Sequence, residues 1–291
     1  MKEEDFNTII IMIRSYTGST IGSKRTLEAE IKAVFPDIPE KTIRNIYSFE
    51  YQRKMKRERP KHFKCVDNWY KVYLRRIPSS TGVLLQMAEE LDISPALLAR
   101  MILEKHYEEK TLKDDSQVSY KNMITQVMKD TSLIDDPILS YEIYLCILHD
   151  DQYGPISECV NYSTGQEYEY KLQKAVQELG IPFSDEEKMR TKGYDKTPDI
   201  KLEIPFAVDG FVVNWIESKA LFGDEECHQN FLKDQFLSYW NRFGTGLVIY
   251  WFGHLDTLEN HSKKKIIIRD HFPTEVTKLD PQVIDPTPIV L

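Results

Sequence analysis

The stretch from Thr197 to Lys219 contains three side chains that could act together on a phosphate ester. Asp199 follows a proline, and Glu217 and Lys219 stand two residues apart near the end of the stretch. Two neighbouring carboxylates raise each other's pKa, and a divalent cation removes that repulsion. Carboxylate oxygens suit Mg²⁺ or Mn²⁺, and Mg²⁺ also binds phosphate oxygens. We therefore expect Asp199 and Glu217 to be metal ligands, while Lys219 orients water or stabilises negative charge.

The same stretch has the pattern of a β-hairpin. β-branched and aromatic residues fill 201–208 and 211–218, on either side of Asp209 and Gly210, and an Asp-Gly pair between two such runs predicts a tight turn. Alternation along the second strand places Glu217 and Lys219 on one face of the sheet.

The register of this hairpin decides whether the three groups meet. With a simple two-residue turn, Asp199 pairs with Ala220, whose side chain points away from Glu217 and Lys219. The chemistry therefore requires a loop with an odd number of residues, a bulge, or a twisted entry at Thr197-Pro198-Asp199. We expect that irregularity near Pro198, because proline has no N–H to give to the ladder.

Two predicted helices flank the hairpin. In the upstream helix, GQEYEYKLQKAVQELG, Glu169 lies on the same side as the apolar Leu172. Glu169 is the expected third acidic ligand and a catalytic candidate, while Glu167 is the alternative, as a supporting or capping group. In the downstream helix, HQNFLKDQFLSYWNRFG, the catalytic candidate Gln235 precedes Tyr239 by one turn. Tyr239 is either a further functional residue or a packed aromatic.

This order of elements resembles the RecB-like branch of the PD-(D/E)xK nuclease superfamily. The runs RTKGYDKTPDI, WIESKALFGDE and DQFLSYWNRFGTGLVIYWFG resemble, more closely, the codanin-interacting nuclease family, whose domain is named for its Thr-Pro-Asp (TPD) motif. The likeness covers most of the chain and is weaker in the first hundred residues. It implies a Holliday-junction-resolvase-like nuclease domain, paired helix-turn-helix regions, a codanin-like protein partner and a location in the nucleus, with the cytoplasm as a second location.

Apolar residues recur with a helical period in the first half of the chain and with strand-like alternation after residue 160. We expect an all-α helix-turn-helix region over residues 1–115 and a helical connector over 116–158. An α/β restriction-endonuclease-like (PD-(D/E)xK) domain should follow over 159–291.

Two helix-turn-helix-like pairs are expected in the first region. In one, Asp37 is the predicted N-cap and Pro39 lies in the first turn of the second helix. In the other, Ser94 is the N-cap and Pro95 the first helical residue. The helix after Pro95 is so apolar that we expect it to pack rather than to read DNA.

A basic strip lies between Arg53 and Arg76. This stretch contains ten Lys or Arg residues and only two acidic ones, with aromatic residues interspersed. Such a strip fits phosphate binding, and a solvated helix face is the alternative. The candidate nucleic-acid-binding residues are Arg53, Lys54, Lys56 and Arg57, together with Lys192 and Lys196 beside the TPD motif.

The 291-residue chain has a formal net charge of −8, which argues against wholesale coating of nucleic acid. Its four cysteines form no CxxC pair, so neither a disulfide framework nor a zinc site is expected. We find no signal-peptide pattern and no transmembrane pattern, and we expect a soluble protein that does not bind membranes.

These observations together predict a metal-dependent deoxyribonuclease that uses Mg²⁺ or Mn²⁺ and cleaves DNA, including branched DNA. The alternative is a catalytically inactive adaptor with a nuclease fold, which binds a codanin-type partner in histone handling.

Overall fold

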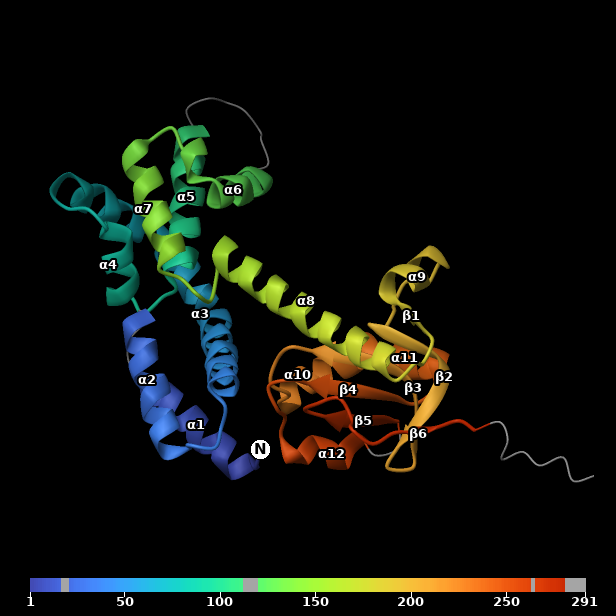
Figure 1. Ribbon diagram of the computed structural model, residues 1–291. Coiled ribbons are helices and arrows are strands. Elements are labelled where there is room, and N and C mark those ends of the chain that lie inside the picture. The colour runs from blue at the N-terminus through green and yellow to red at the C-terminus, as the bar shows by residue number, and fades with distance from the viewer. Residues whose placement is uncertain (17–20, 112–119, 263–264, 281–291) are drawn as a thin grey trace, which may run out of the picture. The chain divides into compact units, whose positions relative to one another are not determined.

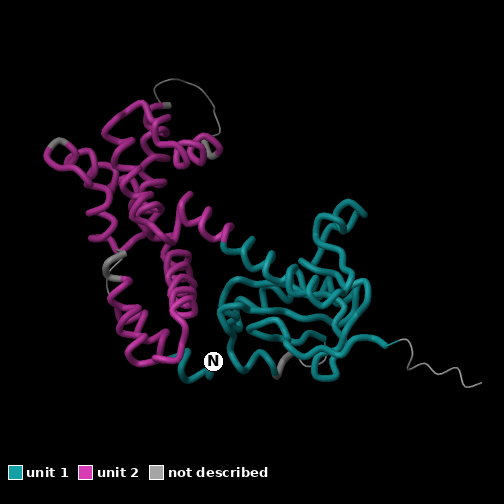
Figure 2. Tube along the Cα trace, viewed as in Figure 1, with its two compact units in different colours: residues 1–7, 164–291 teal, residues 8–163 magenta. Residues whose placement is uncertain are grey.

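The computed structural model describes residues 1–16, 21–111, 120–262 and 265–280. The chain divides into two compact units (Figures 1 and 2). One unit comprises residues 8–163. The other comprises residues 1–7 and 164–291.

The first unit is built of helices. Its elements are α1 (Glu3–Ser15, whose first residues belong to the other unit), α2 (Ile21–Val34), α3 (Glu40–Arg76), α4 (Val83–Glu90), α5 (Pro95–Thr111), α6 (Tyr120–Lys129), α7 (Pro137–Leu148) and the start of α8 (Pro155–Glu178). Two short 3₁₀ turns, Ile77–Ser79 and Thr131–Leu133, precede α4 and α7. No described helix in the chain is long and apolar enough to cross a membrane.

The helix α3 runs without interruption from Glu40 to Arg76. It continues through Pro60 to Arg76, so it carries the whole basic strip. Its N-cap is Pro39, without a side-chain hydrogen bond, so the prediction that Asp37 caps this helix is wrong. The aromatic residues Trp69 and Tyr73 are buried, and α3 packs against α5. These aromatic side chains therefore belong to the core and are not available to stack on bases.

The pair α4 and α5 agrees with the prediction. The hydroxyl oxygen of Ser94 accepts a hydrogen bond from the backbone N–H of Leu97 at 3.2 Å, as an N-cap does. Asp150 strengthens this cap, because its Oδ2 accepts the N–H of Ala96 at 2.9 Å. Leu98 and Ile102 of α5 are fully buried. The apolar helix α5 therefore packs, as predicted.

The second unit contains a six-stranded mixed sheet. The strands are β1 (Phe183–Asp185), β2 (Ile200–Val208), β3 (Phe211–Lys219), β4 (Gly246–Tyr250), β5 (Ile266–Arg269) and β6 (Thr277–Lys278). The order is β1-β2-β3-β4-β5, with β6 also paired to β2. The pairs β3–β4 and β4–β5 are parallel, and the remaining pairs are antiparallel.

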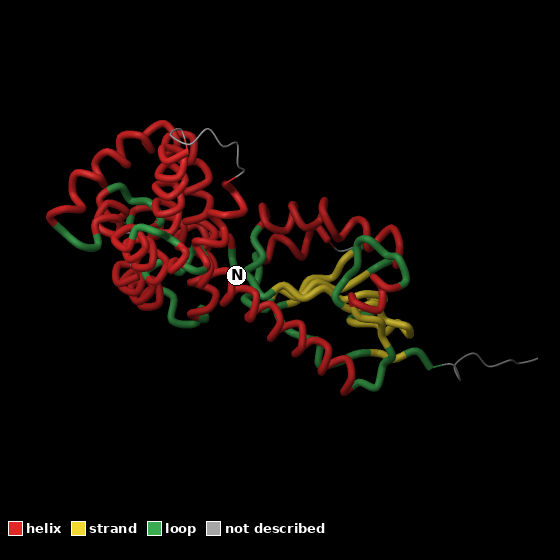
Figure 3. Tube along the Cα trace, turned by 90° about the horizontal axis from the view of Figure 1, so that it is seen from above, coloured by secondary structure: helices red, strands yellow, loops and turns green. Residues whose placement is uncertain are grey.

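Helices cover both faces of this sheet (Figure 3). On one face, Leu172 and Val176 of α8 pack with Ile200 and Ile216. The other face meets the helices between β3 and β4, namely α10 (Glu225–Phe231), a π-helical turn (Leu232–Phe236) and α11 (Leu237–Phe243). The ring of Trp215 lies edge-on to Tyr239 on this face, with centroids 5.3 Å apart.

The close approach of Trp215 to β4 requires glycine. A Cβ built on Gly246 would lie 2.1 Å from the indole of Trp215, far inside van der Waals contact. The indole Nε1–H donates to the carbonyl oxygen of Gly244 at 2.8 Å. Trp215, on the same strand as Glu217 and Lys219, is thus held against the start of β4. Short helices α9 (Glu186–Thr191) and α12 (Asp256–Ser262) complete the unit.

The β2–β3 hairpin has the predicted turn and an irregularity in its register. Asp209 and Gly210 both have positive φ, at 50° and 76°, as a type I′ turn requires. Near the turn Phe206 pairs with Val213, but further along Lys201 pairs with Trp215. Four residues of β2 therefore stand opposite one residue of β3, and the register shifts by three.

The shift is odd, as the chemistry requires, but its expected place near Pro198 is wrong. It lies between Lys201 and Phe206, where Pro205 has no N–H to continue the ladder. On its other edge, β2 stays paired with β1 here, since Leu202 pairs with Phe183. The irregularity therefore concerns the pairing of β2 with β3.

Candidate acidic site at the end of the hairpin

The shifted register brings Asp199 opposite Glu217. The N–H of Asp199 donates to Oε2 of Glu217 at 3.2 Å. In return, the N–H of Ser218 donates to Oδ2 of Asp199 at 2.7 Å. Lys219 completes the group, because its Nζ donates to Oε1 of Glu217 at 2.7 Å. The three side chains singled out in the sequence therefore meet at one end of the hairpin.

Burial and mutual charge dominate the electrostatics of this group. Glu217 is only 2% exposed, and burial raises its pKa despite the neighbouring Lys219. Burial and then the charge of Glu217 raise the pKa of Asp199 well above its usual value. Burial alone would lower the pKa of Lys219, but Glu217 and Asp199 outweigh it and the pKa is raised. Lys219 is consequently an ammonium at neutral pH and offsets the charge of the two carboxylates.

The structure places Glu169 near this group and leaves Glu167 exposed. Glu169 is partly buried on α8, and Gln166 donates to its Oε2 at 3.0 Å. Burial and the charge of Glu186 raise the pKa of Glu169, while Lys219 acts against them. The charge of Glu169 in turn acts on Asp199. Glu169, the glutamate of α8 that helical phase favoured, therefore interacts electrostatically with Asp199.

Glu186, the first residue of α9, was missed by sequence reasoning. Its charge raises the pKa of both Glu169 and Glu217, so it belongs to the same acidic neighbourhood. Arg190 donates to its Oε1 through Nε at 2.8 Å. A sequence pattern that could have indicated α9 is its N-cap, Asp185. The side chain of Asp185 accepts a hydrogen bond from the N–H of Lys188 in the first turn of this helix.

Gln235 and Tyr239 lie on the helices that cover the site's face of the sheet. Gln235 sits in the π-helical turn, and its Oε1 is buried without a hydrogen-bond partner among the described residues. Tyr239 is 2% exposed. Burial, then Glu217 and Asp199, raise the pKa of its hydroxyl. Tyr239 therefore packs on Trp215 and also lies within the electrostatic reach of the carboxylates.

The candidate nucleic-acid-binding residues fall on both units. Lys56 and Arg57 of α3 and Lys192 after α9 are exposed. Arg53 lies over the ring of Phe49 at 5.9 Å. Two others have partners within the protein. Lys54 forms an ion pair with Asp92, and Lys196 Nζ donates to the carbonyl oxygen of Asp234 at 2.6 Å.

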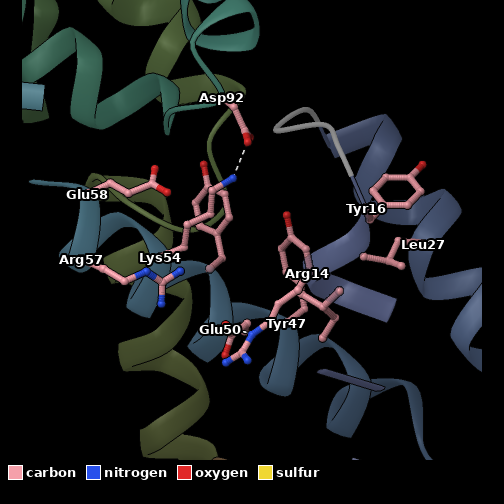
Figure 4. Close-up of a pocket in the computed structure, with 11 residues that line it drawn as sticks. Arg14, Tyr16, Leu27, Tyr47, Glu50, Lys54, Arg57, Glu58 and Asp92 are labelled. Carbon is pink, nitrogen blue, oxygen red and sulfur yellow. Dashed lines mark hydrogen bonds and ion pairs between the residues drawn. The ribbon is translucent and has the colours of Figure 1, made fainter. Parts of the chain in front are cut away.

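A cavity of about 310 Å³ in the helical unit contains none of the acidic site's residues (Figure 4). Its lining includes the ion pair between Arg14 and Glu50 at 2.7 Å, and Lys54 reaching to Asp92. Each of these cations is matched by an acid, so the cavity has no strong preference for an anion.

Two acidic residues, rather than three, are linked by hydrogen bonds at the hairpin end. Among the residues that the structure describes, no group of three or more His, Cys, Asp or Glu side chains could hold a metal ion. Asp199 and Glu217 are hard oxygen donors on adjacent strands, and both oxygens of Glu217 already accept hydrogen bonds. This donor set fits an ion that takes one or two carboxylates and keeps several waters, as Mg²⁺ does.

Comparison with known proteins identifies the family of the chain. Residues 135–272 match a family model described as a protein of unknown function with a TPD sequence motif. The chain is 42% identical over 265 residues to CDAN1-interacting nuclease 1 of Xenopus laevis, covering 90% of this chain and 86% of that protein. The chain belongs to the CDAN1-interacting nuclease family. The resemblance recognised in the sequence is thereby confirmed.

Other members of the family are equally similar over most of their length. The protein of that name from Homo sapiens is 41% identical over 254 residues, covering 86% of this chain and 89% of the relative. That of Gallus gallus is 38% identical over 271 residues, covering 92% and 94%. No solved structure matches the chain. The relatives are named as nucleases, which supports nuclease activity for this chain.

The raised pKa of Asp199 predicts a pH-dependent gain in stability on removing its charge. A carboxyl group whose pKa is higher in the folded than in the unfolded state opposes folding once it is ionised. Asp199→Asn should therefore increase the free energy of unfolding at about pH 8. The gain should shrink as the pH falls towards about 3.9, the ordinary aspartate pKa, where the wild-type group is protonated in both states. Urea denaturation over this pH range measures the effect.

Glu203 provides a control of opposite sign. Hydrogen bonds from Lys201 and Ser184 lower the pKa of Glu203. Glu203→Gln should thus lower stability slightly at neutral pH and lose that effect in acid. A loss of stability in Asp199→Asn at about pH 8 would contradict the electrostatic description of the site.

Proposed function

We propose that the chain is a metal-dependent nuclease of the PD-(D/E)xK type, which hydrolyses phosphodiester bonds in DNA. The observation that carries the proposal is the pairing of Asp199 with Glu217 across the shifted hairpin, with the Lys219 ammonium on Glu217. The mixed sheet covered on both faces is compatible with an α/β nuclease fold. The names of the relatives support the reaction class.

Asp199 and Glu217 would hold the Mg²⁺ or Mn²⁺ ion, with Glu169 as an acidic contributor near them. Such an ion, when bound, stabilises charge on the phosphate and lowers the pKa of water. The two carboxylates have raised pKa values without it, so they gain most from an added positive charge.

Lys219 is the proposed catalytic cation. Glu217 holds its ammonium at 2.7 Å, and the ring of Phe231 lies 4.5 Å from Nζ. In this position the ammonium can orient the attacking water and stabilise the charge that develops on the phosphate oxygens. Water loses a proton as it forms the new P–O bond, the bond to the leaving oxygen breaks, and that oxygen takes up a proton. We assign Gln235 to a polar contact with substrate or water, because its buried Oε1 has no partner among the described residues.

Two substitutions separate metal binding from catalysis. Asp199→Ala should weaken the binding of Mn²⁺ in calorimetric titration, because it removes one of two carboxylate donors. Lys219→Ala should retain metal binding and reduce kcat about 100- to 1,000-fold, because an ammonium stabilises charge without ligating the ion. Cleavage of linear, flapped and four-way DNA with and without Mg²⁺ is the activity assay.

Glu203→Gln is the matched control, since Glu203 lies on β2 and its partners are Lys201 and Ser184. Equal metal affinity in Asp199→Ala and wild type would exclude the assigned ligand. A wild-type protein that binds metal but cleaves none of these substrates would favour the inactive adaptor.

We assign non-specific DNA binding to the exposed cations of α3. Lys56, Arg57, Lys61 and Lys64 are exposed, and all lie on one continuous helix. Trp69, Tyr70 and Tyr73 of α3 are buried, so the proposed contacts are those of the exposed cations with phosphates. Lys192 near the acidic site is assigned the same role.

The salt dependence of DNA affinity tests this assignment. Replacing Lys56, Lys61 and Lys64 by Gln should lower affinity and reduce the slope of log K against log salt by roughly 0.9 for each lost phosphate contact. Fluorescence anisotropy at several salt concentrations gives both quantities. An unchanged slope would show that this part of α3 faces solvent or a protein when DNA is bound.

Partner binding is the second proposed function, because relatives are named for their interaction with CDAN1. The helix α7 offers a surface for it. Ile138, Tyr141, Tyr144 and Leu148 are between 48% and 55% exposed, although the opposite side of α7 is buried. An exposed apolar helix face marks an interaction site. Residue 135, where the family match begins, lies directly before α7. We propose that a codanin-type partner, in the nucleus, covers this face.

Affinity for the purified codanin-type partner tests the assignment of α7. The double substitution Tyr141→Ser and Leu148→Ser should weaken binding at least roughly tenfold, since buried aromatic anchors dominate interfaces. Tyr170→Ser, an exposed aromatic on α8, is the control. Equal affinity of both variants would place the partner elsewhere.

A further inference from the structure

The carboxylate of Asp199 is delivered by a short irregular segment, residues 192–198, between α9 and β2. Residues 192–196 of this segment are exposed, while Thr197 and Pro198 are buried. Exposed connecting segments are the mobile parts of a fold. A catalytic carboxylate, in contrast, must keep its place closely, because a displacement of about 1 Å can cost about 100-fold in rate.

Side chains of the covering helix hold the segment from one side. Arg242 donates through Nη2 to Oδ1 of Asp195 at 2.6 Å and through Nη1 to the carbonyl oxygen of Lys196 at 3.1 Å. A planar guanidinium with several donors suits such a two-point contact. The pKa of Asp195 is lowered, first by its hydrogen bond with Arg242. The ring of Tyr194 adds a contact with Phe243, with centroids 5.7 Å apart.

The segment also holds the helix in return. Lys196 Nζ donates to the carbonyl oxygen of Asp234 at 2.6 Å, and Asp234 lies in the π-helical turn. A π-helical turn widens the helix, and such turns are frequent at functional sites. The next residue, Gln235, has the buried Oε1 without a partner among the described residues. The lysine is therefore bound to the turn that places Gln235.

We propose that Arg242 and Lys196 are positioning residues. They hold residues 192–198, the TPD segment, against the π-helical turn. This set of contacts, the lock, fixes Asp199 and Gln235 relative to each other. Neither residue shares a hydrogen bond or an ion pair with the carboxylates of Asp199 or Glu217 among the described residues. Their effect on catalysis is thus transmitted through the chain. The proposal rests on the nuclease function proposed above, and it assigns Lys196 a role inside the protein in place of phosphate binding.

Steady-state kinetics and hydrogen exchange test this lock in the full-length protein. Arg242→Ala and Lys196→Met should each lower kcat roughly 10- to 100-fold, with KM for DNA changed less than about twofold, because substrate phosphates are not their partners. Exchange of the amides of residues 193–199 should become about tenfold faster in Arg242→Ala, while exchange in β3 stays unchanged.

Lys233→Met and a pair of substitutions at Asp195 serve as controls. Lys233→Met removes the same charge as Lys196→Met from the π-helical turn itself, and Lys233 is exposed. It should leave kcat and exchange as in wild type. Asp195→Asn keeps an oxygen for Arg242 and should retain most of the activity that Asp195→Ala loses.

The outcomes separate the lock from simple charge effects. If Lys233→Met and Lys196→Met raise KM equally and leave kcat alone, the cations act on DNA and the lock is wrong. If Arg242→Ala leaves the exchange of residues 193–199 unchanged, the lock is wrong whatever the kinetics. If wild type cleaves no DNA, the nuclease proposal fails, and the exchange comparison still decides whether Arg242 holds the segment.

Discussion

The acidic site depends on one electrostatic constraint, the burial of two facing carboxylates with a single ammonium. The backbone N–H of Asp199 donates to the Glu217 carboxylate, and the backbone N–H of Ser218 donates to the Asp199 carboxylate. Lys219 supplies the positive charge beside Glu217. Ionised carboxylates in such a place are costly, which is visible in their raised pKa values. The surrounding structure maintains this arrangement against its own electrostatic preference, which is a common feature of functional sites.

Apolar packing on both faces of the sheet offsets the free-energy cost of burying these carboxylates. Trp215 lies against Tyr239 on the same face as Glu217, and Gly246 leaves room for its indole. On the other face, Leu172 and Val176 pack with strand residues in one apolar cluster. Apolar burial on both sides of β3 stabilises the strand that carries the charged pair. The helices that provide this packing also bring Glu169 and Gln235 to the site's surroundings.

The local features of the site could be predicted from the sequence, whereas the long-range ones could not. The hairpin turn followed from Asp209-Gly210, and the choice of Glu169 over Glu167 followed from helical phase, because both depend on neighbours in the chain. The place of the bulge depends on how β2 and β3 pair beyond the turn, which no local pattern reveals. Glu186 was missed for the same reason, since its relation to Glu217 exists only in the folded unit. The burial of Trp69 and Tyr73 of α3 could not be predicted locally either, because packing between helices is a tertiary property.

β2 has three more residues than β3 in the bulge, and the site depends on this number being odd. Because side chains alternate between faces, adding or deleting one residue between Lys201 and Phe206 would turn Asp199 to the opposite face from Glu217. Adding or deleting two would preserve the facing pair and change only the length of the bulge. Chains that share this site should therefore differ in length here by even numbers, and an odd difference should coincide with loss of the acid pair.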